Sequence, residues 1–114
     1  MDKLEIRELA KAIVEEMDRQ YNAELAPKWE GSSIFFIPKN SELKDQEMPI
    51  DKLFHKIVMI RDNLRVLEQQ LNSNDSLSEG EKIKYQGYIT KCYGSLTSFN
   101  FLFYQEDDKF NSKK

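Results

Sequence analysis

The stretch from Ile50 to Leu71 constrains the fold most, because its apolar residues recur at alternating steps of three and four. The residues of this repeat are Ile50, Leu53, Ile57, Ile60, Leu64, Leu67 and Leu71. Such spacing places them along one side of an α-helix, as in the seam of a coiled coil. After a polar break the same alternation returns in Tyr85, Ile89, Cys92, Leu96, Phe99 and Phe103. The two repeats predict a long antiparallel helical hairpin, with helices over about 50–72 and about 78–104.

Residues that start and stop helices support these boundaries. Pro49 suits the first turn of a helix, and either Ser76 with Glu79 or Ser78 with Glu81 can form a capping box. Near the N-terminus an apolar face predicts a first helix over about 3–25, which Pro27 closes. The residues of that face are Ile6, Leu9, Ala10, Ile13, Val14, Met17 and Tyr21.

The connector over 27–49 differs in composition, since it holds the three prolines and the only tryptophan, Trp29. Residues 33–37 read as a short strand buried on both faces, with no obvious partner in the chain. The charged stretch 106–114 is expected to be a frayed tail. The sequence therefore predicts one all-α domain of three helices, with a single short extended arm between the first two.

Composition excludes several classes of function. A length of 114 residues fits one domain, and a net charge of −3 argues against a broad nucleic-acid surface. We expect no membrane span, because no apolar run approaches the roughly 20 residues that a bilayer requires. The charged N-terminus lacks the apolar core of an export signal, and the single cysteine, Cys92, falls on the seam as a buried thiol. A cytoplasmic location follows as the expectation.

Few residues offer chemistry, so we expect neither an enzyme nor a bound cofactor or metal. The only histidine, His55, lies on the outer side of its helix without converging ligands. Arg61 and Arg65 share a helix face and are the candidates for holding an anionic or nucleotide-like ligand. Arginines beside a helical seam also form interhelical ion pairs or cover apolar neighbours with their stems.

Apolar residues exceed what one hairpin and one further helix can bury, which favours a protein-interaction module that forms a homodimer. The candidate interface residues are Trp29, Phe35, Phe54, Met59, Tyr88, Tyr93 and Phe101. Gly87 and Gly94 lie on the helix face opposite the seam, where each costs helix stability. They indicate either a close-packed site for another helix or ligand, or a crossing of the 3–25 helix or a kink at Gly94.

Overall fold

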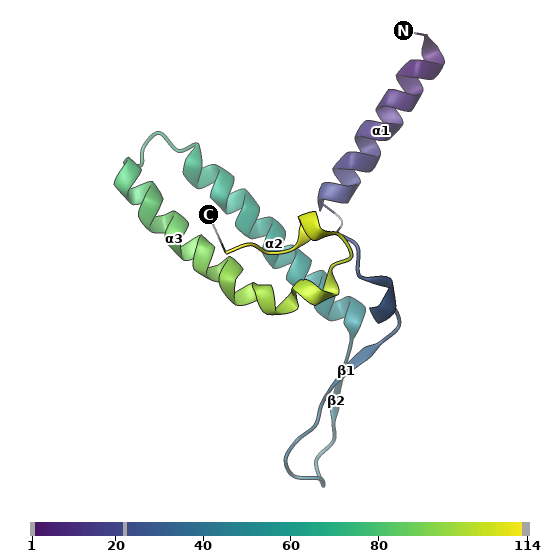
Figure 1. Cartoon of the computed structure of the whole chain (residues 1–114). Coiled ribbons are helices and arrows are strands. Elements are labelled where there is room, and N and C mark those ends of the chain that lie inside the picture. The colour runs from purple at the N-terminus through teal and green to yellow at the C-terminus, as the bar shows by residue number, and fades with distance from the viewer. Residues whose placement is uncertain (1, 22, 113–114) are drawn as a thin grey trace.

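The computed structural model describes residues 2–21 and 23–112, and it describes no side chains between 14 and 21. Within this part the chain is mostly helical, as predicted, and contains a small two-stranded sheet (Figure 1). The regular elements are α1 (Lys3–Tyr21), β1 (Ser33–Phe36), β2 (Gln46–Pro49), α2 (Ile50–Asn72) and α3 (Glu79–Leu96). Short 3-10 helices cover Pro27–Trp29, Thr97–Leu102 and Glu106–Asp108.

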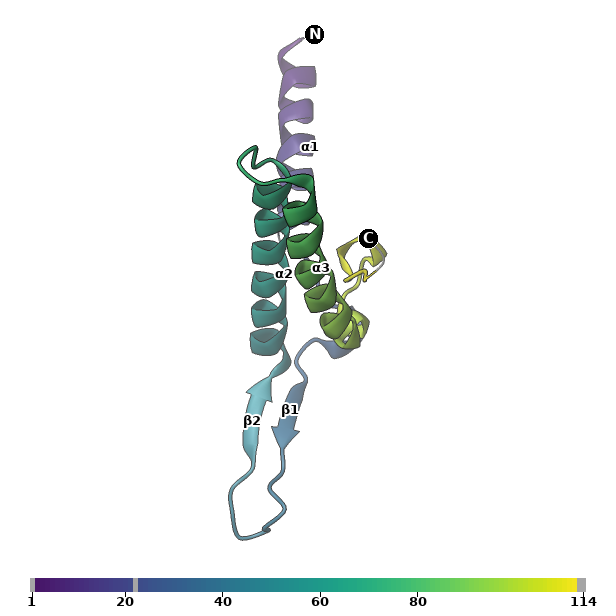
Figure 2. The same cartoon turned by 90° about the vertical axis from the view of Figure 1, so that its left-hand side faces the viewer.

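The α2 and α3 helices lie side by side, joined by a turn (Figures 1 and 2). The bounds of α2 coincide with the predicted range, because Pro49 stands just before the first turn and Asp51 within it. The capping box at the start of α3 is formed by Ser78 and Glu81, which bond to each other's backbone N–H. The Gln86 side chain donates a hydrogen bond to Glu68 and so ties the two helices together.

Two helices end earlier than predicted. α1 stops at Tyr21 rather than at about 25, because the backbone of residues 24–26 pairs instead with residues 102–104. α3 ends at Leu96, where Thr97 donates its hydroxyl to the carbonyl of Gly94 and the chain tightens into a 3-10 helix. Pairing between distant segments therefore accounts for the end of α1, whereas the end of α3 has a local hydrogen bond.

The predicted strand over 33–37 forms, but it has a partner within the chain. β1 pairs antiparallel with β2, with Ile34 opposite Met48 and Phe36 opposite Gln46. Its aromatic side chains are not buried, since Phe35 and Phe36 are each 55% exposed. We call residues 33–49 the β arm, which extends past the end of the helical pair (Figure 2).

The core lies where α2, α3 and residues 103–112, the C-terminal segment, meet. Its buried apolar members are Ile50, Phe54, Ile57, Val58, Leu71, Ile89, Tyr93, Leu102, Phe103 and Phe110. The tail predicted to fray thus contributes Phe110 to the core and buries Asp108, while residues 106, 107, 111 and 112 are exposed and residues 113–114 lie outside the described part. The Asn100 side chain holds it in place, because it accepts from the Phe110 N–H at 2.7 Å and donates to the Phe110 carbonyl at 3.0 Å.

Because the C-terminal segment docks here, the buried face of α2 differs from the predicted seam. Phe54, Val58 and Arg61 face the core, whereas Ile60 and Leu67 are about half exposed. Cys92, expected to be buried in the seam, is also exposed. The C-terminal segment covers one side of the helical pair, so the core forms on that side and part of each repeat is left in solvent.

Gly87→Ala should raise the free energy of unfolding by about 0.5–1 kcal/mol, because alanine restricts the unfolded chain more than glycine does. A Cβ at Gly87 meets no described atom within 4 Å, and α3 is continuous through Gly94. Urea unfolding measures the gain, with Gly94→Ala as the matched control, since its Cβ would meet Ser112 at 3.4 Å and gain less. A loss of stability in Gly87→Ala would instead reveal a closely packed neighbour there.

Candidate functional site

A cluster of charges lies buried between α2 and the C-terminal segment. Arg61 has no exposed side-chain surface, and its guanidinium contacts Asp62 at 2.8 Å and Asp108 Oδ1 at 3.5 Å. It also donates to the main-chain carbonyl of Asp108 at 3.1 Å and lies 5.7 Å from the ring of Phe103. A buried arginine needs such partners to offset the loss of its hydration. Arg61 therefore joins the C-terminal segment to α2.

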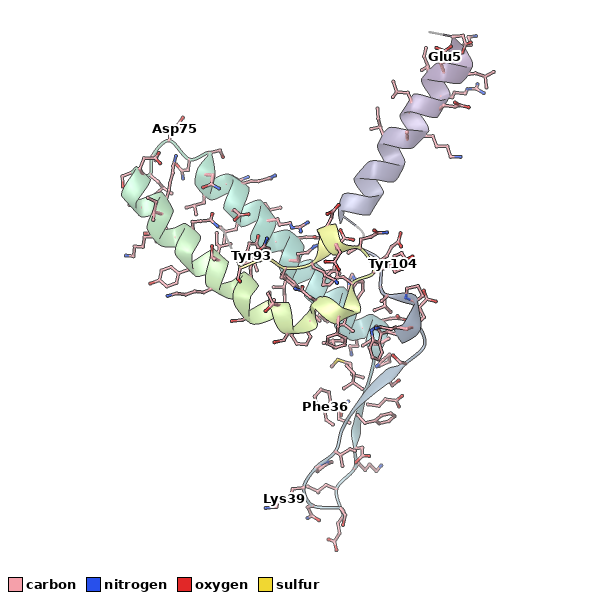
Figure 3. The ribbon with its side chains drawn as sticks, in the orientation of Figure 1. Glu5, Phe36, Lys39, Asp75, Tyr93 and Tyr104 are labelled. Atoms are coloured by element: carbon pink, nitrogen blue, oxygen red, sulfur yellow. The ribbon has the colours of Figure 1, made fainter. Side chains whose placement is uncertain are left out.

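A second polar group continues this cluster toward α3. Glu68 is buried on α2, and it accepts hydrogen bonds from Gln86 and from the Tyr93 hydroxyl, the latter at 3.5 Å. Burial away from water, together with the nearby Glu68 carboxylate, raises the pKa of the Tyr93 phenol above its usual value. Tyr93 therefore stays protonated at neutral pH and acts as a hydrogen-bond donor between the helices (Figure 3).

The predicted anion site loses one of its two guanidinium groups to this cluster. The Arg61 guanidinium pairs with carboxylates of the same chain, and its side chain has no solvent-exposed surface. Arg65 is half-buried, and it lines a small cavity of about 60 Å³ together with Arg61 and Lys109. A larger hollow next to Arg65 is lined by Lys109 and by the carboxylates of Glu106 and Asp107, so its positive and negative side chains balance. Arg61 is thus part of the fold, and an anion beside Arg65 stays a prediction.

The predicted interface residues separate into two groups. Phe54 and Tyr93 are 7% and 4% exposed, so they lie in the core and are not available at a surface. Trp29 is half-buried and packs edge-on against Phe101, with ring centres 5.6 Å apart. The exposed members are Phe35, Met59, Tyr88 and Phe101. They come from the β arm, α2, α3 and the 3-10 helix that follows α3.

Exposed apolar residues gather instead on three surfaces, which we name here. The α1 stripe comprises Ile6, Leu9, Ala10 and Ile13; the hairpin stripe comprises Leu53, Ile60, Leu67, Tyr85, Cys92 and Leu96; the arm surface comprises Phe35, Phe36 and Ile37. Leu53 and Leu96 are half-buried and the others exposed. Every residue of the hairpin stripe belongs to one of the two three-four repeats in the sequence. The repeats alone do not show which of their residues stay uncovered once the C-terminal segment docks.

The α1 helix points away from the helical pair (Figure 1), and its described apolar side chains lie in solvent (Figure 3). Ile6, Leu9 and Ile13 are each about half exposed, and no described α1 side chain belongs to the core. The predicted partners Val14, Met17 and Tyr21 have side chains outside the described part. A crossing of this helix over Gly87 and Gly94 was one alternative for these glycines, and among the described atoms neither of them contacts α1.

Groups that could support chemistry are sparse among the described side chains. His55 is exposed, and no three His, Cys, Asp or Glu residues gather there in a way that could hold a metal ion. No helix in the described ranges is long and apolar enough to cross a bilayer.

Comparisons with known proteins place the chain in a family. The family model covers residues 19–109, which include α2, α3, the β arm and most of the C-terminal segment. No curated protein and no solved structure matches the chain. The chain belongs to the family described as Domain of unknown function (DUF8685).

Proposed function

We propose that this chain is a small protein-interaction module that associates with itself, using the antiparallel pair of α2 and α3 as its rigid platform. The observation that carries the proposal is that whole elements keep their apolar surfaces outside the core. The α1 stripe and the arm surface are exposed in a single copy, and so are Ile60, Leu67, Tyr85 and Cys92 of the hairpin stripe. A large apolar side chain in water forgoes about 1.5–3 kcal/mol of burial, so surfaces of this kind favour a protein partner.

The β arm supports the same proposal. Two strands alone are marginally stable in water, and this pair extends beyond the core with Phe35 and Phe36 on opposite faces. Contact with another protein would cover both faces and the free strand edges. The exposed aromatic residues Tyr88 and Phe101 are further candidates for the rim of such a contact.

The proposed role is binding, without a reaction of its own. The buried charges around Arg61 and Glu68 hold the helices and the C-terminal segment together, which leaves the apolar surfaces for recognition. We place the module in the cytosol, because its single cysteine, Cys92, is exposed and a reducing compartment keeps such a thiol free.

Light scattering behind a size-exclusion column tests self-association. We expect a mass of twice 13.5 kDa at a protein concentration of tens of micromolar. Dilution should shift the mass toward that of one chain, as mass action requires for a reversible dimer. A mass of one chain at every concentration up to about 1 mM, the range of the weakest specific contacts, would rule out self-association.

A further inference from the structure

We infer that α1 of one copy lies along the hairpin stripe of a second copy, and that the second copy returns the same contact. This inference rests on the self-association proposed above and specifies which surfaces meet. It commits to a second copy of this chain as the partner of both the α1 stripe and the hairpin stripe.

The hairpin stripe lies on the side of the helical pair that the C-terminal segment leaves free. On α2, Arg61 faces Asp108 of the C-terminal segment, and Ile60 is one residue, or about 100°, around the helix from it. On α3, Gly94 faces Ser112 of the C-terminal segment. Cys92 precedes Gly94 by two residues, which is a rotation of about 200° about the helix axis, so it lies on the opposite side of α3. Figure 2 shows the C-terminal segment on one side of the pair and no described element on the other.

The α1 stripe has the spacing to pack on this surface. Ile6, Ala10 and Ile13 follow steps of four and three, and Leu53, Ile60 and Leu67 are spaced by whole heptads. Side chains with these two patterns interlock when helices pack nearly parallel or antiparallel. The 19 residues of α1 extend about 28 Å, and the part of α2 from Leu53 to Leu67 extends about 21 Å. The α1 stripe from Ile6 to Ile13 extends about 10 Å and covers half of that length, and the apolar pattern of the sequence continues to Met17 and Tyr21.

The connection to α1 is too short for a contact within one copy. The Glu24 carbonyl accepts a hydrogen bond from the Tyr104 N–H at 3.0 Å, which fixes residue 24 beside the start of the C-terminal segment. Only residues 22 and 23 separate Glu24 from Tyr21, the end of α1, and three Cα steps span at most about 11 Å. That distance is about one helix diameter, so α1 does not reach around α2 to the opposite side of its own copy.

Reciprocal exchange also provides enough contact for a stable dimer. Stable protein interfaces use roughly 20–30 residues from each partner, more than one α1 helix supplies. In a two-fold symmetric exchange each copy contributes both an α1 helix and a hairpin stripe, so two equal contacts form. A pairing of α1 with α1 alone would leave both hairpin stripes in solvent.

Disulfide capture tests the pairing, with Cys92 as the fixed probe in the hairpin stripe. Chains carrying Ile6→Cys, Ala10→Cys or Ile13→Cys, each combined with Cys92→Ser, are mixed with the unaltered chain under mild oxidation. A disulfide between a new cysteine and Cys92 must then join two copies. We expect at least one of the three positions to give about tenfold more of this product than the control, because a disulfide needs Cα atoms within about 7 Å.

Ala12→Cys combined with Cys92→Ser is the matched control. Ala12 is exposed on α1 and lies about 200° around the helix from Ala10, so its thiol should face solvent. Equal capture from Ala10→Cys and Ala12→Cys would overturn the inference. Capture only between two α1 cysteines would also overturn it and would indicate that α1 pairs with α1.

Leu67→Glu provides a second test that needs no oxidation. Leu67 is 53% exposed in one copy, so the variant should fold, but its charge would be buried under the docked α1. We expect its dimer dissociation constant to rise at least about tenfold, whereas Gln69→Glu, on the opposite side of α2, should leave it unchanged. If the unaltered chain is a dimer, but disulfide capture is not enriched and Leu67→Glu does not weaken the dimer, self-association stands and this arrangement is wrong. If the unaltered chain is a monomer, both self-association and this arrangement are wrong.

Discussion

Arg61→Ala should lower the free energy of unfolding by about 3–5 kcal/mol, the range seen when one partner of a buried ion pair is removed. The side chain is 0% exposed, and its guanidinium neutralises Asp62 and Asp108 while binding the Asp108 carbonyl. Without it, the Asp108 carboxyl, which is itself buried, loses the guanidinium group that pairs with it. Urea unfolding followed by circular dichroism at one fixed protein concentration measures the loss.

Arg65→Ala is the matched control, since it removes the same group one turn along α2. Arg65 is half-buried, and a partly exposed arginine of this kind contributes about 0–1 kcal/mol. Arg61→Met combined with Asp108→Asn should regain part of the loss, because a similar volume is filled and the buried carboxylate is gone. If Arg61→Ala and Arg65→Ala cost the same, the cluster does not hold the C-terminal segment.

Local sequence signals predicted the elements whose cause lies close by in the chain. The bounds of α2 follow from Pro49 and from the three-four repeat of its own apolar residues. The start of α3 follows from Ser78 and Glu81, three residues apart. In both cases the residues that decide the structure lie within one or two turns of it, so a pattern can reveal them.

Distant contacts decided the features that the sequence did not reveal. β2 contains Gln46, Glu47 and Pro49, which have little strand preference, and it forms because β1 pairs with it. Arg61 reads as a solvent-facing or ligand-binding side chain until Asp108, 47 residues later, is brought beside it. The choice of which apolar residues stay exposed depends in turn on where the C-terminal segment docks.

The candidate surfaces show the same division. Met59, Tyr88 and Phe101 fall outside the apolar repeats of the helical pair and are exposed, whereas Phe35 was expected in a buried strand and is exposed as well. Phe54 and Tyr93 fall outside or at the edge of those repeats too, yet Phe103 and Phe110 of the C-terminal segment cover them. Helical periodicity alone does not predict that a non-helical segment will cover residues of the helices.

Phe110→Ala should cost about 3–5 kcal/mol of stability, as for other buried phenylalanines. Phe110 is 6% exposed, and its ring lies 5.7 Å from that of Phe103 and 6.2 Å from that of Tyr93. Truncation would leave a cavity between α3 and the C-terminal segment that the main chain cannot close, because the Asn100 side chain holds the Phe110 backbone at both its N–H and its carbonyl. Urea unfolding under the same conditions measures the loss.

Tyr104→Ala separates this effect from the loss of any aromatic ring near the end of the chain. Tyr104 is 56% exposed and lies at the surface (Figure 3), so its removal should cost about 1 kcal/mol or less. A frayed tail, as its charged composition suggests, would instead make Phe110→Ala cost less than Tyr104→Ala. A larger loss in Phe110→Ala than in Tyr104→Ala therefore shows that the C-terminal segment packs into the core. Because that segment covers one side of α2 and α3, its docking also explains why the hairpin stripe on the other side stays uncovered.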